Sequence, residues 1–360
     1  MKISRLNKLF GFSLLFSASI SAAELSGGDV VGRHIYGLAN DYQGDPVMID
    51  ERPLIHSSSQ FNQITSFGES KFLISGFSDT IGSIFVTSID KKAEKYIDTE
   101  ALSLTSIEGI SNPSEGKSTP WGSVIFTENE RIDAANPKNF IQEFAPFYKH
   151  KPELVKPYKY GWVSEVIVLD EKGQAKAIKN YALGRLFADQ VLIMPDAKTV
   201  YMLDKLGNLY LFIAEEANSL AKGKLYALSQ EQNKIKYSLL GKPSALKVKF
   251  KLKKAKFKSI FHSATPKNGQ CKRKYTLVNT VYGEECLKIN KKYKKYAAYF
   301  EPIRYMALKG INRFTKKDQK LIFDAEKNQL ILTHNNSLAA TLSLSNNEEF
   351  KSQYIIKEQI

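Results

Sequence analysis

Short segments rich in Val, Ile, Phe and Tyr recur along this chain, and most of them end at or near Gly, Asn or Asp. Such runs, bounded by turn residues, are typical of β-strands joined by short connections. The sequence therefore predicts an all-β fold. The clearest segments are residues 72–75, 83–89, 123–127, 162–169, 200–203, 208–213, 224–229, 235–240 and 330–333.

Three longer stretches, residues 71–86, 198–212 and 328–342, resemble one another. Each holds an apolar strand, a polar turn and a second apolar strand, with Asp79, Asp204 or His334 in the turn. Repeated hairpins of this kind indicate a β-propeller, because one blade alone cannot bury its faces. A β-sandwich built from unrelated hairpins is the alternative.

A few short helices are expected in inserted and C-terminal regions of this fold. Residues 140–148 form a weak helical pattern, and residues 291–308 form a stronger one with aromatic side chains at helical spacing. Pro302 should end or kink the second helix. Residues 130–160 contain four prolines and are expected to form a long surface connection.

The first residues resemble an export signal. Lys2, Arg5 and Lys8 precede an apolar run over residues 9–20, and small residues at 21 and 23 suit cleavage after Ala23. The run is shorter than the roughly 20 residues that span a bilayer. We expect residues 1–23 to be removed, and residues 24–360 to form a single domain that is periplasmic or secreted, without a stable membrane span.

Only two cysteines, Cys271 and Cys286, occur in the chain. In an oxidising compartment two such thiols commonly pair, so we expect a disulfide, with two separate thiols as the alternative. Two cysteines are too few for a zinc ribbon or an iron–sulfur cluster.

Positive charge is concentrated in one part of the chain. The net charge is +15, and residues 242–320 hold 23 Lys and Arg against four acidic residues. A surface of this kind attracts polyanions such as lipopolysaccharide or extracellular nucleic acid. Within it, Lys residues at 247, 249, 251 and 253 alternate with Val248, Phe250 and Leu252, the pattern of a half-exposed strand.

The common catalytic signatures are absent from the sequence. It has no Walker loop, no G-x-S-x-G and no H-E-x-x-H, and its five histidines are dispersed. Serine hydrolase and zinc peptidase mechanisms therefore have no support. Carboxylates beside turn residues stand out instead, and such hard oxygen ligands suit calcium or magnesium.

Several segments follow one another in the order of a known family. Residues 118–129 (STPWGSVIFTEN), 160–166 (YGWVSEV), 182–189 (ALGRLFAD) and 200–205 (VYMLDK) resemble motifs of the PhoX family of exported alkaline phosphatases. Residues 207–212 and 223–227 continue the resemblance, and weaker similarity follows at residues 310–318 and 332–336. The resemblance implies a β-propeller with a central metal cluster and phosphatase activity.

The chain departs from this family at its metal ligands. Thr127 stands at the position of the family's iron-binding Cys, and Thr is a poor replacement for a thiolate on iron. The same motif and three later ones also depart from the family at ligand positions, but each keeps one carboxylate, namely Glu128, Asp189, Asp204 and Asp318. The resemblance therefore implies calcium at these oxygens and makes iron doubtful.

The first hypothesis is an exported phosphatase that acts on a phosphate-ester substrate. In it Glu128, Asp189, Asp204 and Asp318 are metal ligands, and Glu128, Lys316 and Arg185 are catalytic. The second hypothesis is a non-catalytic propeller that holds an anionic partner through residues 242–320, and the third is a binding subunit that has lost its metals. Convergence of the four carboxylates separates the first hypothesis from the others, and the oligomeric state is left open.

Overall fold

A computed structural model describes residues 38–40, 46–48, 59–78, 80–90, 96–231, 234–347 and 352–359. The predicted signal segment 1–23, its cleavage position after Ala23 and the turn residue Asp79 lie outside these residues. Among the helices that are described, none is long and apolar enough to cross a membrane.

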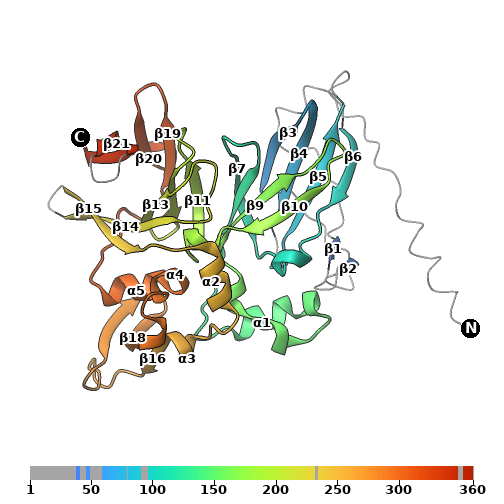
Figure 1. Ribbon diagram of the computed structural model, residues 1–360. Helices are drawn as coiled ribbons and strands as arrows, with labels where there is room; N and C mark the ends of the chain where they lie inside the picture. The colour runs from blue at the N-terminus through green and yellow to red at the C-terminus, as the bar shows by residue number, and fades with distance from the viewer. Residues whose placement is uncertain are drawn as a thin grey trace, which may run out of the picture.

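The protein consists mainly of antiparallel sheets that follow one another along the chain (Figure 1). Strand pairing orders the four larger sheets as β3-β4-β5-β6, β10-β9-β8-β7, β11-β12-β13-β14-β15 and β19-β20-β21-β22. The strands of the first two are β3 (Phe61–Phe67), β4 (Ser70–Phe77), β5 (Ser83–Ile89), β6 (Tyr96–Ala101), β7 (Pro113–Ser118), β8 (Val124–Glu128), β9 (Val163–Val168) and β10 (Ala175–Lys179).

The third and fourth sheets use the C-terminal half of the chain. Their strands are β11 (Ala188–Ile193), β12 (Thr199–Asp204), β13 (Leu209–Ala214), β14 (Gly223–Glu231), β15 (Lys234–Gly241), β19 (Lys320–Asp324), β20 (Gln329–His334), β21 (Ser337–Asn347) and β22 (Ser352–Gln359). Two small sheets complete the set, formed by β1 (Leu38–Asn40) with β2 (Pro46–Met48), and by β16 (Phe261–Ala264), β18 (Gly283–Ile289) and β17 (Thr276–Thr280).

The predicted hairpin repeats are confirmed as strand pairs. Residues 71–86 form β4 with β5, residues 198–212 form β12 with β13, and residues 328–342 form β20 with β21. Each pair is antiparallel and belongs to a different large sheet. The mostly β fold is therefore confirmed, whereas the propeller is not, because the sheets that the structure describes do not close into a ring (Figure 1).

The expected helices occur, and the second one is broken. Helix α1 (Lys138–Phe144) continues into η4 (Ala145–Tyr148), as predicted. Residues 291–308 divide into η8 (Lys291–Tyr293), α4 (Ala297–Phe300) and α5 (Pro302–Leu308). Pro302 begins α5, where its missing N–H costs nothing. The short 3-10 turns elsewhere are η3 (Thr105–Ile107), η5 (Pro152–Leu154), η6 (Pro157–Lys159) and η7 (Tyr181–Leu183).

The strand expected over the alternating lysines is wrong, because these residues form helix α2 (Ala245–Leu252). Val248 and Leu252, four residues apart, are buried in the largest hydrophobic cluster, as helical spacing requires. Phe250, expected on the same side as Val248, is instead exposed. Helix α3 (Phe257–Ile260) follows α2.

Residues 242–320, here called the basic module, lie almost wholly between the third and fourth large sheets in the sequence. They contain α2, α3, the sheet β16-β18-β17, η8, α4 and α5, which occupy the lower left of Figure 1. Val248, Leu252, Ile260 and Phe300 pack with side chains of β12, β13 and β14 in one hydrophobic cluster. The basic module is thus anchored to the third sheet by a shared core.

The predicted disulfide is confirmed: Cys271 and Cys286 are joined, with their Cα atoms 5.5 Å apart. It links β18 to the segment between β16 and β17, and Cys286 is fully buried. A disulfide is compatible with an exported protein, because such bonds persist in oxidising compartments.

Reduction of this disulfide should lower the free energy of unfolding by about 3 kcal/mol, because it closes a short loop of the unfolded chain. Chemical denaturation with and without dithiothreitol measures the loss. The double variant Cys271→Ser/Cys286→Ala is the control and should be insensitive to dithiothreitol. An unchanged denaturation midpoint for the reduced wild-type protein would contradict the prediction.

Candidate functional site

Hydrogen bonds connect several of the predicted site segments, both within the second large sheet and between it and the third. The Trp121 indole N–H donates to Glu165 Oε1 at 2.8 Å, and the Gly161 N–H donates to Glu128 Oε2 at 3.1 Å. Asn129 Nδ2 donates to Asp189 Oδ1 at 2.9 Å. The Asn129–Asp189 bond thus joins the end of β8 to β11, across the two sheets.

Glu128 ends β8 and is enclosed by the protein. Its Oε1 lies 3.1 Å from Lys179 Nζ, and both side chains are almost completely buried. The N–H groups of Ser111 and Gly161 donate to Oε2, and the Ser164 hydroxyl donates to Oε1. Burial raises the pKa of Glu128 and lowers that of Lys179, while each charge partly offsets the shift of the other. The counter-charge of Glu128 is thus Lys179.

Asp204 ends β12 and is also fully buried. Arg131 approaches its Oδ2 at 3.5 Å. Its Oδ1 accepts the N–H groups of Leu206 and Asn208, and Asn208 Nδ2 donates to Oδ2 at 2.8 Å. Burial raises the pKa of this carboxyl, and Arg131 opposes the rise. Both oxygens of Asp204 therefore hold the turn that follows β12.

Asp189 lies beside Asp204, at a register shift between β11 and β12 where Ala188 pairs with Asp204. It is half-buried and has two partners: Asn129 by a hydrogen bond and Lys205 Nζ at 3.8 Å. An irregularity of this kind turns a side chain out of the strand pattern. The Asp189 side chain here meets Asn129, at the end of β8.

Asp318 and Lys316 lie in a loop on the surface. The Asp318 N–H donates to the Lys205 carbonyl at 3.1 Å, so the loop reaches the turn after β12, but the Asp318 side chain is exposed. Lys316, Arg313 and His334 line a cavity of about 480 Å³ between this loop, β14, β20 and β21. None of the four predicted carboxylates lines this cavity.

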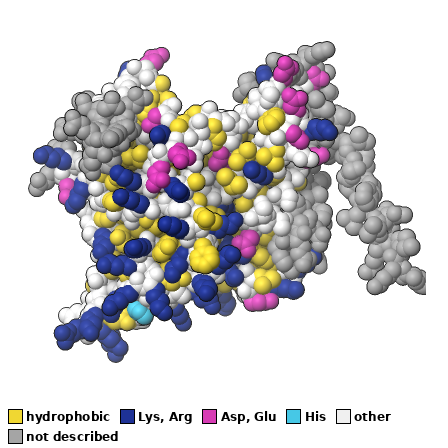
Figure 2. All heavy atoms as spheres, in the orientation of Figure 1, with side chains coloured by type: hydrophobic (Ala, Val, Ile, Leu, Met, Phe, Trp, Pro, Cys, Tyr) yellow, Lys and Arg dark blue, Asp and Glu magenta, His cyan; other side chains and the backbone are white. Residues whose placement is uncertain are grey.

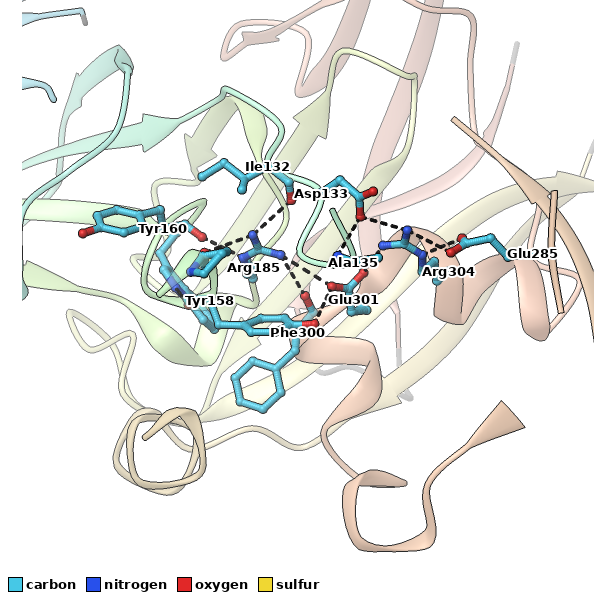
Figure 3. Close-up of polar contacts among 12 residues, drawn as sticks. Ile132, Asp133, Ala135, Tyr158, Tyr160, Arg185, Glu285, Phe300, Glu301 and Arg304 are labelled. Carbon is cyan, nitrogen blue, oxygen red and sulfur yellow. Dashed lines mark hydrogen bonds and ion pairs between the residues drawn. The ribbon is translucent and has the colours of Figure 1, made fainter. Parts of the chain in front are cut away.

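Arg185 is buried, and Figure 3 shows its guanidinium surrounded by polar groups of the protein. Its Nε donates to the Tyr160 carbonyl at 2.7 Å, and its two terminal nitrogens donate to the carbonyls of Phe300, Ile132 and Pro157. Glu301 Oε1 lies 3.8 Å away. Every nitrogen of the guanidinium thus has a partner inside the protein.

Arg304 extends the same network into the basic module. Its guanidinium binds Glu285 through two nitrogens at 2.7 and 3.1 Å, Glu301 Oε2 at 2.9 Å and Asp133 Oδ1 at 2.9 Å (Figure 3). It also lies over the rings of Tyr282 and Phe257. Burial lowers the pKa of Arg304, but the three carboxylates raise it by more, so Arg304 stays charged.

The residues present do not fit a metal centre. In the described part of the chain, no three His, Cys, Asp or Glu side chains are grouped to hold an ion. The buried polar atoms without a partner there are a guanidinium nitrogen of Arg131 and the hydroxyls of Ser111, Tyr210 and Ser229, and no carboxylate oxygen is among them. Lysine and arginine supply the positive charge at Glu128, Asp189 and Asp204.

The charged partners of these site residues were not predicted from the sequence. Lys179 ends β10, Arg131 lies two residues beyond Asn129, and Glu301 and Arg304 stand 3 residues apart at the start of α5. Of these, only the Glu301–Arg304 pair could have been recognised in the sequence, because oppositely charged residues three apart meet on a helix. Lys179 and Arg131 pair with Glu128 and Asp204, respectively, and both pairs join positions far apart in the chain.

Comparison with known proteins finds no matching family model and no matching curated protein. Solved structures show only distant likeness. Pseudomonas fluorescens PhoX in complex with vanadate, a transition state analogue, is 12% identical with a TM-score of 0.42, and the match covers 83% of this chain and 62% of PhoX.

Two proteins provisionally assigned as 6-phosphogluconolactonases also match. The one from Bacteroides uniformis is 12% identical over 92% of this chain and 94% of its own, with a TM-score of 0.26. The one from Bacteroides fragilis is 9% identical over 92% of each chain, with a TM-score of 0.27. Likeness at this level assigns no residue of the site.

The Glu128→Gln substitution should lower the free energy of unfolding by about 3 to 5 kcal/mol, because it leaves the Lys179 charge buried without its partner. Urea denaturation measures the loss. The double variant Glu128→Gln/Lys179→Met should recover much of it, since both charges are removed.

Glu231→Gln serves as the matched control, because the Glu231–Lys236 pair is similarly close, at 2.9 Å against 3.1 Å, but exposed. It should cost no more than about 1 kcal/mol. Equal losses for Glu128→Gln and Glu231→Gln would show that the buried pair does not support the fold.

Proposed function

We propose that the protein binds an anionic partner through the exposed lysines of the basic module, with the β-sheets as its scaffold. The observation that carries this proposal is that nearly all basic side chains of the module lie on its surface, while two of its four acidic side chains face inward. All of its Lys and Arg side chains are exposed except Lys251, which is half-buried, and Arg304, which is buried.

The acidic residues of the module leave this charge largely uncompensated. Glu285 and Glu301 face inward and bind Arg304. Glu284 and Asp318 are the two that are exposed. Figure 2 accordingly shows Lys and Arg side chains, with few acidic ones, over α2, α3 and the β16–β18 sheet. Such a surface concentrates polyanions near it and releases them as salt rises.

The phosphatase hypothesis has less support from the geometry. Calcium-assisted hydrolysis requires carboxylate oxygens that are free to bind the ion. Glu128 and Asp204 are neutralised by Lys179 and Arg131, and Asp318 is exposed at the surface. A calcium cluster at these residues would require the protein's own cations to move away.

A second candidate function is the binding of a small phosphate ester in the cavity lined by Lys316. Arg313, Lys316 and His334 supply cationic or hydrogen-bonding groups there, and Thr315 and Gln319 add polar ones. Titration calorimetry with phenyl phosphate tests this candidate. Binding that is lost in Lys316→Ala would support it, and the absence of heat for the wild-type protein would exclude it.

The proposal predicts that reversing three charges on α2 weakens polyanion binding. The variant Lys247→Glu/Lys249→Glu/Lys253→Glu should bind heparin at least about tenfold more weakly than the wild-type protein, given roughly 1 kcal/mol per lysine near an anionic surface. Affinity chromatography over a salt gradient, followed by titration at fixed salt, measures the change.

The control variant is Lys151→Glu/Lys172→Glu/Lys176→Glu, which changes net charge equally at exposed positions outside the module. It should retain most of the affinity. Equal loss in the two variants would mean that overall charge, and not the module, determines binding. Failure of the wild-type protein to bind any polyanion at low salt would contradict the proposal.

A further inference from the structure

We infer that the partner of the basic module is the surface of an anionic lipid bilayer, which α2 enters with Leu246 and Phe250. This inference rests on the proposed function and names its partner. The two side chains are 78% and 72% exposed, respectively, although both are large and apolar. Exposed apolar groups of this size within a charged patch commonly mark an interaction surface.

The spacing along α2 places these two side chains together and away from the core. Successive residues turn by about 100° around a helix, so Leu246 and Phe250, four apart, lie on one face. Val248 and Leu252 lie on the opposite face and are buried. Lys249 and Lys253 border the exposed apolar pair on one side, and Lys247 on the other.

The body of the protein holds α2 in this orientation. Val248 and Leu252 belong to the largest hydrophobic cluster. Lys251 lies over the Tyr293 ring at 4.3 Å, and the Tyr293 hydroxyl donates to the Lys254 carbonyl at 2.9 Å. The helix cannot rotate to hide Leu246 and Phe250 without giving up these contacts.

An aliphatic side chain next to an aromatic one favours a lipid surface over a nucleic acid. Phe250 could stack on a base, but Leu246 has no such partner in a nucleic acid. Both side chains can enter the boundary between headgroups and acyl chains, while the surrounding lysines meet the lipid phosphates. Figure 2 shows hydrophobic side chains among the Lys and Arg side chains on this face.

Sedimentation with vesicles of phosphatidylcholine, with and without phosphatidylglycerol, tests the inference on the purified protein. We expect binding that requires phosphatidylglycerol and decreases with salt. Phe250→Ser should reduce the partition coefficient by about tenfold, because burial of the ring in the interface is lost. Leu246→Ser should have a similar, somewhat smaller effect.

The control variant is Leu338→Ser, which removes a side chain that is 69% exposed on β21, outside the module. It should leave vesicle binding unchanged, and Phe250→Ser should leave heparin binding unchanged. If heparin binds but the wild-type protein ignores anionic vesicles, or if Phe250→Ser sediments with them like wild type, the lipid inference is overturned and the proposed function stands. If neither heparin nor anionic vesicles bind, both are overturned.

Discussion

Two buried arginines that share Glu301 connect the basic module to the rest of the protein. Arg185 approaches one oxygen of Glu301 at 3.8 Å, and Arg304 binds the other at 2.9 Å. A buried charge that loses its partner is strongly destabilising, so the network fixes the positions of the segments that supply it. These are residues 132–160, the turn before β11, the beginning of β18 and the start of α5.

This network also accounts for the charge on the surface. Because Glu285 and Glu301 face inward to Arg304, they cannot neutralise the lysines on the outside of the module. The same inward-facing glutamates therefore anchor the basic module and leave its surface strongly basic. The same use of internal pairs occurs at the sheets, where Lys179 and Arg131 compensate Glu128 and Asp204.

Much of the fold could be predicted from the sequence, because its signals are local. The hairpin repeats, the break at Pro302 and the Cys271–Cys286 bond all depend on short patterns or on the only two cysteines in the chain. Helix α2 was mistaken for a strand because Val248 and Leu252 fit a period of two as well as a spacing of four. Packing against the core selects the helix.

The site was harder to predict, because its character depends on contacts between distant residues. The sequence singled out Glu128 and Arg185, and the two are buried with partners 51 and 116 residues away, respectively. No spacing rule gives such pairs. The sequence shows that a carboxylate is present, but only the fold shows whether a lysine or a metal would balance it.

The chain's own lysine and arginine side chains, and not metal ions, are expected to neutralise Glu128, Asp189 and Asp204. Elemental analysis of the purified protein after equilibration with calcium, together with hydrolysis of a chromogenic phosphomonoester, tests it most directly. We expect no stoichiometric calcium and no calcium-dependent turnover. Stoichiometric calcium with turnover that is lost in Glu128→Ala and in the exposed-site variant Asp318→Ala would contradict it.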